Sequence, residues 1–104
     1  MEARLAKDAE ERISLGVSKI AAAHPKGMAS FNQCRAEVPN YVNLTAADLA
    51  PSSTRPGEPI WHQIVRNIKS HDKEDSNYIA RGYLKHEAKR GYSITEAGRK
   101  KLSK

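Results

Sequence analysis

The stretch Trp61-His62-Gln63-Ile64-Val65-Arg66-Asn67-Ile68-Lys69-Ser70-His71 is the part of this chain with the clearest structural pattern. Its four apolar residues stand at i, i+3, i+4 and i+7, a spacing that gathers them on one face of a helix. The opposite face carries side chains that can donate to phosphates or read base edges, namely Gln63, Arg66, Asn67 and Ser70, with Lys69 at its margin. We therefore predict an amphipathic helix over about residues 60–71, with one face on a core and the other toward nucleic acid.

Charge is distributed unevenly along the chain, whose net charge is +6. Residues 1–50 hold six basic and six acidic residues, while residues 51–104 hold twelve basic and six acidic ones. The whole excess lies in the half that contains the predicted helix, as expected for a surface that binds a polyanion. The alternative is a solvated surface that happens to be basic.

Length and composition indicate one small globular domain over residues 1–104. No run of about 18 apolar residues is present, so we expect no membrane association, and the N-terminus lacks the apolar core of a signal peptide. Cys34 is the one cysteine, which excludes an internal disulfide and favours a reducing cytoplasm, where the protein would associate with the nucleoid. We find no Gly-rich phosphate loop, no Cys/His metal set and no nucleophile–base pair, and therefore expect no enzyme, metal or cofactor.

An apolar stripe predicts a first helix over residues 4–23: Leu5, Ala9, Ile13, Val17 and Ile20. Gly16 interrupts this helix and could bend it, at a cost of about 1 kcal/mol relative to Ala. Either the helix is core scaffold, or its early turns extend from the core and pair two copies into a homodimer.

The segment after the first helix contains two helix N-cap signals. Met28-Ala29 can form a short strand, and Ser30 is expected to cap a helix over Phe31–Val38 that Pro39-Asn40 stops. Phe31, Cys34 and Val38 would form the buried side of that helix. Thr45 then caps a brief helical turn over residues 44–49, with Asp48 in the capping-box position.

Residues 51–59 form the clearest loop of the sequence, because they are rich in Pro, Ser and Gly. We interpret it as an ordered loop that leads into the helix at residues 60–71, with Pro59 in the first turn. Arg55 lies close enough in sequence to join that helix in contacting a phosphate.

The end of the chain predicts a β-hairpin followed by a helix. Tyr83–Glu87 alternates in side-chain type, Ala88–Gly91 can make a tight turn with Gly91 at positive φ, and Tyr92–Ile94 returns. Thr95 is expected to cap a terminal helix over Glu96–Leu102. The hairpin is basic, with Lys85 on the first strand and Lys89 and Arg90 at the tip.

These elements follow a recurring pattern, Trp-x-x-Ile-Val-x-x-Ile and then Gly-Tyr-Leu-x-x-x-x-x-x-Gly-Tyr-x-Ile-Thr-x-x-Gly-Arg. Over about residues 58–102 the chain resembles the winged-helix domain at the N-terminus of Mrr-type restriction proteins and related winged-helix modules. The resemblance implies an α+β winged helix-turn-helix fold: a three-helix core, a C-terminal hairpin wing over about residues 83–94, and a short terminal helix. It departs from the restriction proteins in having no recognisable Asp…(Asp/Glu)-x-Lys nuclease arrangement.

We therefore expect a protein that binds double-stranded DNA, as a transcriptional regulator or as a nucleoid- or restriction-associated module. The helix would enter the major groove, and the wing would lie on the backbone or in the minor groove. The expected DNA-binding residues come from the loop, the helix and the wing: Arg55, His62, Gln63, Arg66, Asn67, Lys69, Ser70, Lys85, Lys89 and Arg90.

Two alternatives to duplex DNA binding remain open. The first is a winged-helix module that binds an acidic protein, which an apolar exposed face on the 60–71 helix would favour. RNA binding is the second, but the six aromatic residues do not interleave with the basic ones into a stacking platform.

Overall fold

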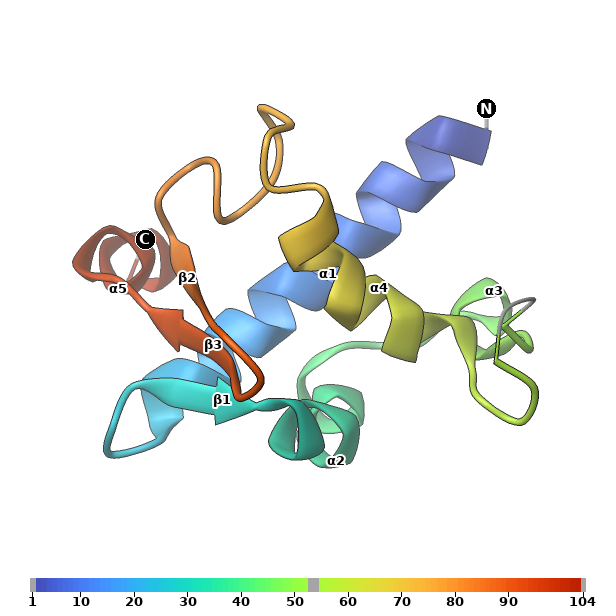
Figure 1. The fold of residues 1–104 in the computed structure, drawn as a ribbon, viewed down its shortest axis with the longest axis horizontal. Helices are drawn as coiled ribbons and strands as arrows, with labels where there is room; N and C mark the ends of the chain where they lie inside the picture. Colours follow the sequence, from blue (N-terminus) through green and yellow to red (C-terminus); the bar gives the residue numbers. More distant parts are fainter. Residues whose placement is uncertain (1, 53–54, 104) are drawn as a thin grey trace.

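In this computed structural model, backbone is described for residues 2–52 and 55–103, and side chains of the first helix from residue 8 onward. The long helix α1 (Glu2–Ala23) runs diagonally behind the other elements, and most of them pack against it (Figure 1). The others follow in the order β1 (Met28–Ser30), α2 (Phe31–Tyr41), α3 (Ala46–Leu49), α4 (Ile60–Ser70), β2 (Leu84–Glu87), β3 (Gly91–Ile94) and α5 (Glu96–Leu102). The α+β class is therefore confirmed.

Helix α1 forms the centre of the hydrophobic core. Ala9, Ile13, Val17 and Ile20 are all buried, as their spacing predicts, while Leu5 lies outside the described side chains. Gly16 does not interrupt the first helix, since α1 runs continuously from Glu2 to Ala23. Gly16 instead lets a neighbouring segment approach closely, because a Cβ there would clash with the side chain of Val42. The homodimer through this helix stays a prediction.

Helix α2 corrects one prediction. Ser30 caps it as expected, with a capping box that Gln33 completes, and Cys34 and Val38 are buried. The helix does not stop at Pro39-Asn40, however, but continues to Tyr41. Pro39 removes one helical N–H donor, but the next turn still closes through the Val42 N–H, which donates to the Val38 carbonyl at 2.9 Å.

The three strands form one antiparallel sheet in the order β1-β3-β2. The hairpin is confirmed, with Leu84 opposite Ile94 and Glu87 opposite Gly91. Gly91 has positive φ as expected, at 157°, and Lys89 at the tip also has positive φ, at 64°. Gly91 is needed where β1 crosses it, because a Cβ there would clash with the Ala29 carbonyl.

The helix predicted over residues 60–71 is α4, and Pro59 occupies its N-cap position rather than its first turn. Trp61, Val65 and Ile68 are buried against the core, and burial of each such side chain contributes about 1.5–3 kcal/mol. The two short capped elements also form where expected, α3 behind Thr45 and α5 behind Thr95. In the described part of the chain, no helix is long and apolar enough to cross a membrane.

Candidate nucleic-acid interface

An open groove with a volume of about 740 Å³ lies between α2, α4, the 51–59 loop and the tip of the hairpin. Cationic side chains from all four segments line it, and they come from positions up to 55 residues apart: Arg35, Arg55, Arg66, Lys89 and Arg90. Glu58 is the one acid among the described residues that line it. We call this feature the basic groove. Four of the ten residues predicted to bind DNA meet here.

The hairpin tip is held against the start of α2. The Phe31 N–H donates to the Arg90 carbonyl at 2.9 Å, so the tip cannot swing freely. Below the tip, the Phe31 ring meets the edge of the Tyr92 ring with centroids 5.6 Å apart. These contacts place Lys89 and Arg90 on one wall of the groove.

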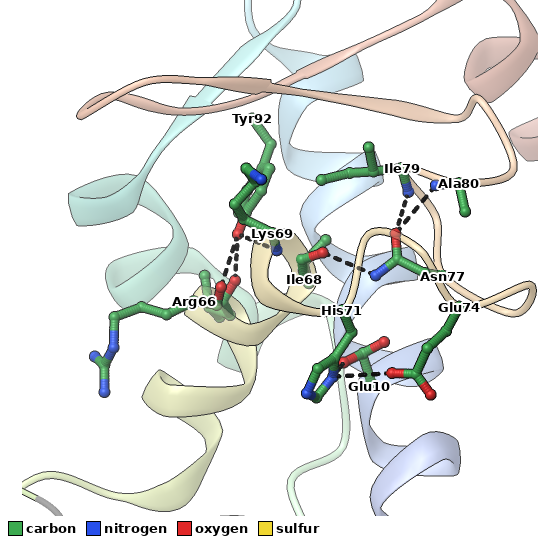
Figure 2. Close-up of polar contacts among 11 residues, drawn as sticks. Glu10, Arg66, Ile68, Lys69, His71, Glu74, Asn77, Ile79, Ala80 and Tyr92 are labelled. Atoms are coloured by element: carbon green, nitrogen blue, oxygen red, sulfur yellow. Dashed lines mark hydrogen bonds and ion pairs between the residues drawn. The ribbon is translucent and has the colours of Figure 1, made fainter.

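Tyr92 links the hairpin to α4 through its buried hydroxyl (Figure 2). The hydroxyl donates to the Val65 carbonyl at 2.6 Å and accepts from the Lys69 N–H at 3.2 Å. These two backbone groups are separated by four residues, so the hydroxyl bonds to a donor and an acceptor that pair with each other in a regular helix. Burial raises the pKa of Tyr92 well above its usual range, which keeps the phenol protonated. The link fixes α4 relative to the strand that carries the wing.

Asn77 fixes the other end of α4. Its buried amide donates to the Ile68 carbonyl at 2.8 Å, and its carbonyl oxygen accepts from the N–H groups of Ile79 and Ala80. Figure 2 places Asn77 beside the end of the helix, between Ile68 and the following turn. One side chain thereby caps α4 and shapes the connection to β2.

Arg66 is already paired in the free protein. Its guanidinium lies 2.6 Å from the Glu58 carboxylate, which also lies 4.0 Å from the His62 ring. Arg66 holds the pKa of Glu58 below its usual range, so Glu58 is ionised at neutral pH. Burial lowers the pKa of His62, and the nearby Arg35 and Arg66 lower it further, although Glu58 acts in the opposite direction. His62 is therefore a neutral imidazole at neutral pH, and any phosphate contact it makes is an ordinary hydrogen bond.

The other predicted residues lie outside the groove. On α4, Gln63 accepts from the Ser52 hydroxyl at 3.0 Å, and Lys69 pairs with Asp72 at 2.8 Å. Asn67 is half-buried and Ser70 is exposed farther along the helix. Lys85 is exposed and lies opposite Ser93 in the sheet, away from the residues that line the groove.

Two charged residues of the groove are missing from the sequence-based prediction, Arg35 and Glu58. Arg35 is exposed on the first half of α2, where its spacing from the buried Cys34 and Val38 marks it as outward-facing. That spacing does not say which element it faces. Glu58 lies in the polar 51–59 loop, where an acidic residue is ordinary. Its partner Arg66 is eight residues farther along the chain, on the next helix, so the sequence does not indicate the pair.

No family model, curated protein or solved structure matches this chain. Among the described residues, no three His, Cys, Asp or Glu side chains are grouped so as to hold a metal ion. The fold and the groove define the chain as a small α+β domain with a concentrated basic surface.

Proposed function

We propose that this chain is a winged helix-turn-helix domain that binds double-stranded DNA through α4 and the hairpin. The single observation that carries the proposal is the basic groove, where Arg55 and Arg66 meet Lys89 and Arg90 of the hairpin tip. The element order supports it too, because a helical core followed by a hairpin that packs beside α4 is the arrangement that a winged helix requires.

Electrostatics supports the same proposal. The net charge of +6 comes from residues 51–104, which supply four of the five cations in the groove. A cluster of this kind attracts a polyanion from a distance and gives affinity that falls steeply with salt. A role in transcription, in the nucleoid or in a restriction system is part of this proposal, and each of these roles depends on duplex binding.

The acidic-protein alternative has less support. A protein-docking helix presents apolar side chains, whereas the surface of α4 that reaches solvent carries polar and charged groups. The residues with the largest exposure on α4 are Lys69 and Ser70.

The proposal is tested by titrating a labelled random duplex with the protein at several salt concentrations. Arg66→Ala and the double variant Lys89→Ala/Arg90→Ala should both weaken binding, and the double variant should lower the salt slope by up to about two. Arg99→Ala/Lys100→Ala removes the same charge from α5 and is the matched control, which should change affinity much less.

Chemical-shift mapping with the same duplex locates the contact. Perturbations should concentrate on residues 62–70 and 85–92 and at Arg55. A map centred on α1, or no binding at low salt with micromolar protein, would reject DNA binding by this surface.

A further inference from the structure

Glu58 is an acid placed among cations that would otherwise be available to a ligand. It is held there by backbone hydrogen bonds of the loop: its carbonyl accepts from the Ser52 N–H at 2.8 Å, and its N–H donates to the Arg55 carbonyl at 3.1 Å. Its side chain is 20% exposed and pairs with Arg66 at 2.6 Å. Backbone hydrogen bonds to Ser52 and Arg55 therefore hold this carboxylate in the groove.

The surrounding charges exceed what one carboxylate can neutralise. Arg35, Arg55 and Arg66 approach the groove from α2, from the loop and from α4, and the hairpin tip adds two more cations. Clustered cations repel one another unless an anion lies among them. Glu58 supplies a single negative charge, and its pairing with Arg66 leaves Arg35 and Arg55 without a described carboxylate partner in an ion pair.

We propose that the basic groove is a binding site for a phosphate of a nucleic-acid backbone, that Arg35 of α2 is one of the residues that bind the phosphate, and that Glu58 occupies the site in the free protein. This inference rests on the proposed function. It adds Arg35 and Glu58 to the binding site, and it adds a competition between the Glu58 carboxylate and the phosphate. A carboxylate and a phosphate present similar anionic oxygens to a guanidinium. A phosphate that binds the same N–H groups of Arg66 therefore competes with Glu58.

The groove favours a phosphate over the carboxylate of an acidic protein. Three guanidinium groups from three segments approach from different directions, which suits a tetrahedral anion with oxygens on all sides. A carboxylate has two oxygens in one plane and is matched by one guanidinium fork. Negative charge on Glu58 also repels an incoming phosphate, so the pair opposes binding until the phosphate replaces it.

The decisive variant is Glu58→Gln, which keeps the side-chain shape and removes the charge. It should bind the random duplex about threefold to tenfold more tightly than the wild type at low salt, because no ion pair has to break. Glu74→Gln removes the same charge from an exposed position beside His71 and is the matched control, with an expected change below about twofold. Arg35→Ala should weaken binding about threefold to tenfold.

If Glu58→Gln binds as the wild type does or more weakly while its thermal unfolding is unchanged, Glu58 positions Arg66 and the competition is refuted. If Arg35→Ala leaves affinity unchanged, Arg35 is not part of the site.

A second measurement separates this inference from DNA binding itself. Inorganic pyrophosphate is titrated into labelled Glu58→Gln protein, and the amide shifts of Arg35, Arg55 and Arg66 are followed. Shifts there with no duplex binding would reject the proposed function and keep the phosphate site, while duplex binding without these shifts would reject the site. Stronger competition for the duplex by polyglutamate than by a single-stranded oligonucleotide would assign the groove to an acidic protein and overturn the proposal.

Discussion

Replacing Tyr92 by Phe removes one oxygen atom from the interior of the protein and tests the link between the hairpin and α4. The hydroxyl is fully buried, donates to the Val65 carbonyl at 2.6 Å and accepts from the Lys69 N–H at 3.2 Å. In Tyr92→Phe both backbone groups lose this partner, but they are four residues apart in one helix and can bond to each other.

The expected cost follows from these two hydrogen bonds. Each contributes about 0.5–1.5 kcal/mol net, and the loss is limited because the Val65 carbonyl and the Lys69 N–H can pair with each other within the continuous helix α4. We therefore expect Tyr92→Phe to lower the free energy of unfolding by about 1–2 kcal/mol, and Tm by about 5–15 °C for a domain of this size. If the two backbone groups had no other partner in the variant, the cost would rise to about 3 kcal/mol or more.

Urea unfolding followed by tryptophan fluorescence measures this effect, because Trp61 lies on the buried face of α4. Tyr83→Phe is the matched control, since the Tyr83 hydroxyl accepts only an exposed bond from Arg81 among the bonds described, and its change should stay within about 0.5 kcal/mol. A Tyr92→Phe variant as stable as Tyr83→Phe would show that the hydroxyl contributes nothing net. An altered m value would mean that the substitution changes the unfolded state or the cooperativity instead.

Two further substitutions test the core. Asn77→Ala should lower the free energy of unfolding by about 2–3 kcal/mol, because the Ile68 carbonyl and two N–H groups lose a buried partner. Ser76→Ala, at the exposed neighbouring position, is the control and should change this free energy by less than about 0.5 kcal/mol. Equal effects of the two substitutions would refute the capping role of Asn77. Burial raises the pKa of the Cys34 thiol from 9.0 to about 12, so the unfolded chain releases a proton that the folded protein keeps. The free energy of unfolding should then fall as pH rises above 9, by up to about 1.4 kcal/mol per pH unit. Cys34→Ala should remove that part of the slope in urea unfolding measured across this range, and an unchanged slope would contradict it.

Sequence reasoning was most accurate for features that depend on neighbours in the chain. The N-caps at Ser30, Thr45 and Thr95 form as expected, because a capping side chain bonds to a backbone N–H three residues away. The buried faces of α1 and α4 follow from spacing alone for the same reason. The prediction that the second helix stops at Pro39 was wrong, because a proline near the end of a helix does not have to end it, and the positive φ of Lys89 at the hairpin tip was not foreseen.

The amino-acid sequence by itself determined the α+β class, the amphipathic helix at residues 60–70, the basic hairpin and the segregation of charge. Only the tertiary structure decided which cations share a surface, because Arg35 and Arg90 meet through the packing of the hairpin tip on α2. It also decided that Glu58 neutralises Arg66, and that Tyr92 and Asn77 hold α4 in place. These contacts join residues 8 to 59 positions apart, and side-chain spacing within one element carries no information about them.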